Sequence, residues 1–352
     1  MIQRLSSSDL NLNLFTDLIS TVSDKPALAA SLVEGVPVYS AQELANNLES
    51  ESRSQLLDEW AEVLLNGAGV FAITGAVSNE AIMDQATTVF QDIIAGEKAA
   101  SVGGGDHFAT AGNNDRIWNS LEKHALSDPA NFAAYYANPW IDAAAEAWLG
   151  PRYQMTAQAN LVRPGGQAQT GHRDYHLGFM SQQQAAQFPA HVHAVSATLT
   201  LQGAIAHVDM PVESGPTKLL PHSQKYELGY LAFHDQSYRD LFEDRCVQLP
   251  LKKGDLLWFN PALFHGAGAN HTRDVERLVN LFQVSSAFGR PMESVDREAM
   301  LKRVEPLLPS YRGLERQALV RATAEGYAFP TNLDTNPPVG GLAPETDQDR
   351  LL

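Results

Sequence analysis

Three residues of this sequence have side chains and a spacing that suit one metal ion. His172 and Asp174 are two positions apart in GHRDYH, just after a strand-like stretch and a Pro-Gly-Gly turn. Alternate residues of an extended chain point to the same side, so both side chains are predicted to face one ion. His265, in DLLWFNPALFHGAGAN, is the predicted third ligand. Two imidazoles and one carboxylate leave three adjacent octahedral positions open, as in non-haem iron(II) oxygenases.

An arginine that follows the third candidate ligand could hold a second anion. A 2-oxo acid such as 2-oxoglutarate fills two open iron positions by chelation, and its distal carboxylate then needs a fixed cation. Arg277 begins an apolar strand 12 residues after His265, and its planar guanidinium suits a carboxylate. Arg273 is the alternative, but it lies in the polar turn NHTRD, where a solvated side chain is expected. Arg277 is therefore the predicted anchor.

Short strand-like segments separated by Gly, Pro, Asn and Asp turns must position these residues. They cover residues 153–162, 193–205, 217–221, 245–251, 255–260 and 277–285. This spacing is typical of a jelly-roll or cupin-like barrel, so the predicted fold class is mainly β with flanking α. Asn160 and Thr198 alternate with apolar residues and are predicted to point into the barrel and bind the 2-oxoglutarate carboxylates. Any half-exposed sheet shows the same alternation.

Helical patterns precede and follow the strands. Apolar residues recur at three-to-four-residue intervals over 54–66, a strand follows at 69–75, and a second helix begins with Ser78 as its cap. The glycine-rich stretch from Gly103 to about Asp115 is predicted to be a loop over the site. Further helices are predicted over residues 140–148, 295–307 and 313–325. The predicted organisation is an accessory segment (1–53), a barrel domain with N-terminal helices (54–290), and a helical extension with an irregular tail (291–352).

Charge and cysteine content narrow the possible partners. The 352 residues carry 25 Lys and Arg against 41 Asp and Glu, a formal charge of −16, which disfavours nucleic acid and anionic membranes. A single cysteine, Cys246, excludes an internal disulfide and a multi-thiolate metal site. No apolar run reaches about 18 residues, and no secretory leader is evident. We expect a soluble cytoplasmic protein with a small-molecule partner.

Several segments together resemble a known family. GHRDYH, DMPVESGPTKLLPHSQ (209–224), KKGDLLWFNPALFHGAGAN (252–270) and the arginine that follows resemble the phytanoyl-CoA dioxygenase family of Fe(II)- and 2-oxoglutarate-dependent oxygenases. LLNGAGVFAITGAVSNEAI (64–82) is similar to the family's N-terminal part, and the resemblance covers roughly residues 55–290. It implies a double-stranded β-helix core. It also implies that His172, Asp174 and His265 bind Fe(II), that Arg277 anchors 2-oxoglutarate, and that O2 is a co-reactant.

The resemblance further implies hydroxylation of an unactivated carbon, with succinate and CO2 as coproducts. Iron halogenases of this architecture lack the carboxylate ligand, so Asp174 favours hydroxylation over halogenation. Two alternatives remain open: a cupin-like isomerase or hydrolase that uses its metal without oxygen, and a metal-free binding module. Arg173 stands where many members carry Gln, and it is interpreted as solvated, with an anionic substrate as its alternative partner. The terminal segments have no assigned counterpart and could serve in oligomerisation or substrate choice.

Other histidines match parts of the pattern. His207 and Asp209 have the same spacing as the predicted ligand pair, but the resemblance places this segment downstream of the iron pair. His191 and His193 also have matching parity, yet no carboxylate or arginine nearby completes a site, so a solvated strand entrance is expected. For His176 a place in the pocket and simple packing are both open.

Overall fold

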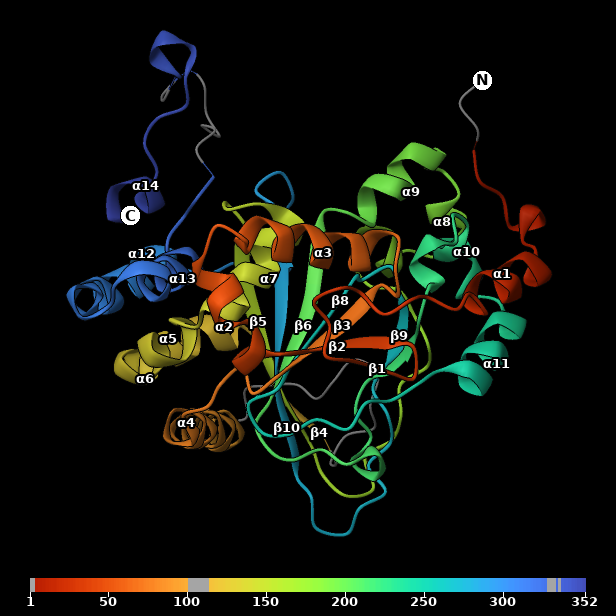
Figure 1. Ribbon diagram of the computed structural model, residues 1–352, viewed down its shortest axis with the longest axis horizontal. Helices are drawn as coiled ribbons and strands as arrows, with labels where there is room; N and C mark the ends of the chain where they lie inside the picture. Colours follow the sequence, from red (N-terminus) through yellow and green to blue (C-terminus); the bar gives the residue numbers. More distant parts are fainter. Residues whose placement is uncertain (1–3, 101–113, 328–333, 335–336) are drawn as a thin grey trace.

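The strands of the computed structural model form two sheets, and the structure describes residues 4–100, 114–327, 334 and 337–352. Eight strands make the large sheet, in the order β1-β2-β3-β8-β6-β10-β5-β4, and β7 pairs with β9 in a small one (Figure 1). The strands are β1 (Ser31–Val33), β2 (Val36–Ser40), β3 (Val70–Thr74), β4 (Asn114–Ile117), β5 (Gln154–Val162), β6 (Thr200–Ala206), β7 (Lys218–Leu220), β8 (Leu256–Phe259), β9 (Phe264–Gly266) and β10 (Arg277–Ser285).

Single bridges widen the small sheet on both sides. His172 pairs with His265 of β9, and Val247 pairs with Leu219 of β7, both antiparallel. Four chain segments therefore lie side by side opposite the large sheet, and a cavity lined by both sheets lies between them. The predicted double-stranded β-helix core is confirmed.

Successive side chains of β10 point alternately into the cavity and into the core on the outer side of the large sheet. Arg277, Val279, Leu281 and Gln283 line the cavity. Phe282 points to the opposite side, where it stacks on Trp258 of β8 with ring centroids 5.4 Å apart. A two-residue period of this kind is what an extended strand between a cavity and a helical layer requires.

Two groups of helices flank the sheets (Figure 1). One group, with α4–α7, α12 and α13, packs on the outer face of the large sheet, and the other, with α1 and α8–α11, lies beside the small sheet. The helices are α1 (Leu12–Ile19), α2 (Ala41–Glu49), α3 (Arg53–Leu65), α4 (Glu80–Ala99), α5 (Ser120–Ser127), α6 (Pro129–Tyr136), α7 (Pro139–Leu149), α8 (Gln182–Ala185), α9 (Ala190–Ser196), α10 (Gly229–Ala232), α11 (Gln236–Arg245), α12 (Arg297–Val304), α13 (Gly313–Thr323) and α14 (Asp347–Leu351).

Two predicted strands are wrong in part. The strand predicted over 193–205 begins only at Thr200, because Pro189 starts a helical turn and α9 occupies the preceding residues. The segment predicted as a strand over 245–251 starts at the end of α11 and makes only isolated bridges at Val247 and Leu251. In both places polar and apolar residues alternate as in a strand, but tertiary packing selects a different backbone.

The terminal segments contribute to both sides of the molecule. Residues 31–40 add β1 and β2 to the edge of the large sheet, and Phe15 of α1 packs against Tyr226, Tyr238 and Phe264 beside the small sheet. The loop predicted from Gly103 to about Asp115 falls largely outside the described residues. Within the part of the chain that is described, no helix has both the length and the apolar content to span a membrane.

Candidate metal centre

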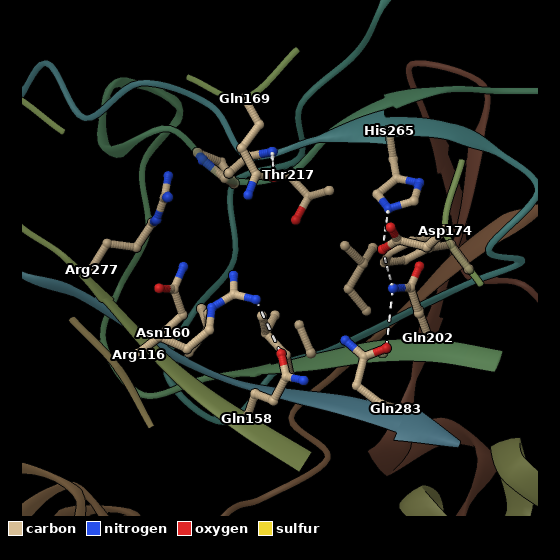
Figure 2. Close-up of a pocket in the computed structure, with 18 of the residues that line it drawn as sticks. Arg116, Gln158, Asn160, Gln169, Asp174, Gln202, Thr217, His265, Arg277 and Gln283 are labelled. Atoms are coloured by element: carbon tan, nitrogen blue, oxygen red, sulfur yellow. Dashed lines mark hydrogen bonds and ion pairs between the residues drawn. The ribbon is translucent and has the colours of Figure 1, made fainter. Parts of the chain in front are cut away.

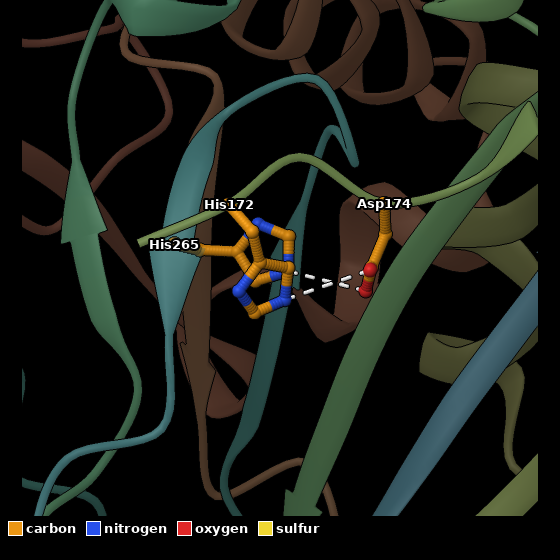
Figure 3. A group of neighbouring side chains, drawn as sticks. All are labelled: His172, Asp174 and His265. Carbon is orange, nitrogen blue, oxygen red and sulfur yellow. Dashed lines mark hydrogen bonds and ion pairs between the residues drawn. The ribbon is translucent and has the colours of Figure 1, made fainter. Parts of the chain in front are cut away.

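Backbone pairing between two distant segments brings the three predicted ligands together. His172 N donates to His265 O at 3.0 Å, and His265 N donates to His172 O at 3.1 Å. This antiparallel pair sets the two imidazole rings side by side, with centroids 4.6 Å apart. Asp174 follows on the same extended segment, and its N–H donates to Pro261 O at 3.1 Å. One ligand atom from each of the three side chains lies within 4.8 Å of the other two (Figure 3).

Hydrogen bonds fix which nitrogen of each imidazole faces the centre. His172 Nδ1 lies 2.8 Å from Thr170 O, and His265 Nδ1 lies 2.8 Å from Leu263 O. A carbonyl oxygen only accepts, so both Nδ1 atoms carry the proton and donate it. Each Nε2 then presents a lone pair toward Asp174, at 3.5 Å from Oδ1 for His172 and 3.3 Å from Oδ2 for His265.

The electrostatics of His172, Asp174 and His265, here called the triad, favour the protonation state that a metal site requires. Burial raises the pKa of Asp174, but His172 and His265 lower it more, so this pKa lies well below its usual range. Burial lowers the pKa of His265, and Asp174 offsets only part of that effect. A carboxylate beside a neutral imidazole is the protonation state that binds a metal cation.

A cavity of about 340 Å³ joins the triad to the predicted cosubstrate anchor. Figure 2 shows Arg277 at the end of the cavity opposite His265 and Asp174. Its Nη1 donates to Ser214 O at 2.9 Å and to Gly268 O at 3.0 Å, which fixes the guanidinium in place. Burial lowers the pKa of Arg277 to about 10, so the group remains a cation at neutral pH. Arg273 is exposed and does not line the cavity.

The two residues predicted beside Arg277 have different places. Asn160, on β5, lines the cavity next to Arg277, and its buried Oδ1 has no hydrogen-bond partner. Thr198 is exposed, donates to Val195 O at 3.0 Å, and lies outside the cavity. The prediction for Thr198 is therefore wrong: the residue follows α9 and precedes the first residue of β6, so strand alternation does not apply to it.

Arg173, between the two predicted ligands, is buried, so the prediction that it is solvated is wrong. It is only 2% exposed, and its Nη2 donates to the carbonyl oxygens of Ser223 and Tyr226 at 2.6 and 3.1 Å. Its guanidinium also lies over the rings of Tyr230 and Phe264. Burial lowers the pKa of Arg173 to about 10. This arginine ties the ligand segment to the small-sheet side and has no contact with the cavity.

The other candidate histidines lie elsewhere. His207 is buried between Tyr135 and Thr87, whereas Asp209 is exposed and bonded to Lys252. His193 lies in α9 and bonds Ala185 O, so the parity argument for a strand fails there. His176 lies 3.3 Å from Ser196 Oγ and does not line the cavity.

Sequence reasoning missed several polar residues that line the cavity. Gln202 of β6 donates to Asp174 Oδ2, and Gln283 of β10 accepts a hydrogen bond from Gln202 (Figure 2). Gln158, which has the same strand parity as the predicted Asn160, also lines the cavity and accepts a hydrogen bond from Arg116 at 3.0 Å. For Gln283 the signal was available, because it lies an even number of positions from Arg277 on one strand. Gln169 comes from an irregular segment, where no periodicity could identify it, and Thr217 directly precedes β7.

Comparisons with known proteins show one family. The model of the phytanoyl-CoA dioxygenase (PhyH) family matches residues 55–279. Dioxygenase trt7 of Aspergillus terreus is 26% identical over 165 residues, which is 47% of this chain. The chain therefore matches about half of that relative's length, again 47%.

Two of the solved structures that are similar to this chain are those of SnoN and HygX. The epimerase SnoN of nogalamycin biosynthesis, in complex with Fe3+, alpha ketoglutarate and nogalamycin RO, has 18% identity and a TM-score of 0.45 over 66% of this chain and 85% of its own. HygX of Streptomyces hygroscopicus, with nickel and 2-oxoglutarate bound, has 12% identity and a TM-score of 0.43 over 70% of this chain and 91% of its own.

Proposed function

From the premise that this chain belongs to the phytanoyl-CoA dioxygenase family, we propose that it is an iron(II)- and 2-oxoglutarate-dependent oxygenase. The proposed reaction hydroxylates an unactivated carbon of a small molecule and releases succinate and CO2. His172, Asp174 and His265 hold the iron in this proposal, Arg277 anchors the distal carboxylate of 2-oxoglutarate, and Asn160 lies beside it.

The observation that carries the proposal is the orientation of three electron-pair donors toward one point. Two imidazole Nε2 lone pairs face a carboxylate at 3.5 and 3.3 Å. Without a cation between them, these groups repel one another, because none of the three has a proton to share in this tautomeric state. A divalent ion that accepts nitrogen and oxygen ligands removes the conflict. The donor set thus fits iron(II).

The residues of this chain bind, orient and exclude water. Iron(II) with 2-oxoglutarate supplies, when bound, the oxidising power that removes a hydrogen atom from carbon. Apolar residues such as Val279, Leu257 and Phe259 line the cavity between the triad and Arg277 and keep its centre poor in water. The backbone carbonyls at Thr170 and Leu263 hold the imidazoles in one tautomer, which keeps both Nε2 atoms available.

Cavity size supports a small substrate. Ligand sites commonly measure about 300–1,000 Å³, and a volume of about 340 Å³ is near the lower limit. Such a cavity has room for 2-oxoglutarate and a compact second molecule. A small molecule is therefore the substrate proposed for this chain.

Succinate release with iron(II), 2-oxoglutarate and a panel of small metabolites tests the proposal. We expect basal release that rises with one compound class and requires both additions. Metal binding without any 2-oxoglutarate-dependent succinate would instead support a non-oxidative cupin-like enzyme, and absence of metal binding would support a binding module.

A matched pair of arginines tests the cosubstrate anchor. Arg277→Lys removes the planar fork, and we expect the KM for 2-oxoglutarate to rise about 10-fold or more. Arg273→Lys changes an exposed guanidinium outside the cavity and should leave that KM unchanged. Equal effects of the two substitutions would reject Arg277 as the anchor.

A further inference from the structure

Asp174 has a hydrogen-bond partner that is not a ligand. Gln202 Nε2 donates to Asp174 Oδ2 at 2.6 Å and to Gln283 Oε1 at 3.1 Å. Tyr175 donates its hydroxyl to the same Gln283 oxygen at 3.0 Å. Gln202, Gln283 and Tyr175 are each at most 5% exposed, so these bonds form without competing water. Figure 2 shows the contacts between Gln283, Gln202 and Asp174 in one line.

The orientation of both amides follows from chemistry. Ionised Asp174 can only accept, so the side-chain nitrogen of Gln202 must face it. The second proton of this nitrogen needs an acceptor, which fixes the oxygen of Gln283 toward Gln202. The Gln283 nitrogen is then directed into the cavity, as Figure 2 shows. The hydrogen bonds that join Asp174, Gln202, Gln283 and Tyr175, here called the relay, therefore have one consistent arrangement.

The backbone beside Asp174 has a rare conformation at two successive residues. Tyr175 has φ 63° and ψ 147°, and His176 has φ 41°. Residues other than glycine seldom adopt such angles, and they persist where surrounding contacts enforce them. The buried hydroxyl of Tyr175 on Gln283 is one such contact. A strained backbone directly after a ligand indicates that its side-chain direction is tightly set.

We propose that Gln202 is a positioning residue that makes Asp174 a one-oxygen ligand. This inference rests on the proposed iron site. The bond from Gln202 engages one lone pair of Oδ2, the oxygen that also lies 3.3 Å from His265 Nε2, and so favours Oδ1, which faces His172 Nε2, as the oxygen that binds the metal. An octahedral ion held by two imidazoles and one carboxylate oxygen keeps three positions open, whereas a carboxylate that binds through both oxygens leaves two. A chelating 2-oxo acid takes two, so Gln202 preserves the third for the remaining co-reactant.

Gln202→Met tests the inference, since methionine keeps the length of the side chain and lacks the donor. In tag-free protein we expect the affinity for Ni2+, measured by titration calorimetry, to fall about 10- to 100-fold. With Co2+ as the probe, the visible absorption spectrum should change in shape and intensity, because the coordination of the ion changes. A role in folding alone would move the unfolding midpoint without altering the Co2+ spectrum.

Gln158→Met is the matched control. Gln158 is an amide of the same cavity that contacts Arg116 and not Asp174, so Ni2+ affinity and the Co2+ spectrum should equal those of the unaltered protein. If Gln202→Met does not fold, Tyr175→Phe removes the far end of the relay without loss of volume, and a smaller change of the same kind is expected.

The possible failures are distinguishable. If the unaltered protein binds Ni2+ and Gln202→Met, or Tyr175→Phe in its place, binds it equally well with the same Co2+ spectrum, the positioning role is overturned and the iron site stands. If the unaltered protein binds neither ion, the proposed function fails and this inference fails with it.

Discussion

His172 and His207 each precede an aspartate by two residues, yet the two pairs have different surroundings. His172 and Asp174 converge with His265 at the end of a cavity. His207 is buried between Thr87 of α4 and Tyr135 of α6, on the outer side of the large sheet, while Asp209 is exposed. The same spacing thus yields a candidate ligand pair in one place and a structural histidine with a surface carboxylate in the other.

Backbone geometry accounts for the difference. His172 pairs with β9 and Asp174 continues the extended segment, so side chains two positions apart face the same way. At His207 the chain leaves β6, and residues 207 and 208 form a bend. Parity is lost at a bend, so Asp209 turns to solvent. An HxD pattern therefore predicts paired side chains only where the chain stays extended across it.

Asp174→Ala should break the first pair with the largest effect. Two imidazoles remain, and the only anionic ligand is gone, so we expect Ni2+ affinity to fall by more than about 100-fold, beyond the range usual for residues that only support a ligand. Succinate release should be lost as well. Calorimetric titration measures the affinity, and Asp209→Ala is the matched control. Equal losses in both variants would contradict the assignment of the pair.

His207→Leu should affect stability and not metal binding. Thr87 Oγ1 already donates to Met83 O, so it accepts from His207 Nδ1 at 2.9 Å, and Nε2 accepts from the Tyr135 hydroxyl at 2.9 Å. Leucine leaves buried polar partners without their hydrogen bonds, so we expect a loss of about 2 kcal/mol or more in the free energy of unfolding. Chemical denaturation measures this loss. Ni2+ affinity should stay unchanged, and a weakened affinity would place His207 in the metal site.

The contributions of His207 and Asp174 to folding stability should be lost in different pH ranges as the solution is made more acidic. Burial lowers the pKa of His207 from 6.5 to about 3, so between these values the unfolded chain binds a proton that the folded protein does not. The stability contributed by the neutral imidazole is therefore lost as pH falls through this window. The pKa of Asp174 in the folded protein is depressed below 3.8. The stability that this carboxylate contributes is therefore lost in a lower pH range, as pH falls through its pKa in the folded protein.

The slope of stability against pH measures the His207 contribution. In the His207→Leu variant the group is absent from both states, so the slope below pH 6.5 should fall by up to about 1.4 kcal/mol per pH unit, the value for one proton. Denaturation curves at several pH values above about 4 give this slope. An unchanged slope would mean that His207 is already protonated in the folded protein.

Sequence alone predicted the parts of the fold and site that depend on local patterns. β10 has the predicted bounds, 277–285, because a largely apolar run lies there between two turns, and α3 differs from its prediction by one residue at each end. The burial of Arg173 could not be predicted, since its partners are backbone carbonyls some fifty positions away. The relay through Gln202 and Gln283 joins two strands, and only their register brings the amides together.

Asp209→Asn should have the smallest effect and completes the comparison. Asp209 Oδ2 lies 2.7 Å from Lys252 Nζ, and both side chains are more than half exposed. Exposed ion pairs contribute little to stability because water and salt screen them. We therefore expect the unfolding midpoint in low salt to shift slightly at most, any shift to disappear in high salt, and Ni2+ affinity to match the unaltered protein. A loss of metal affinity here would show that the surface carboxylate reaches the site, and the contrast between the two HxD pairs would fail.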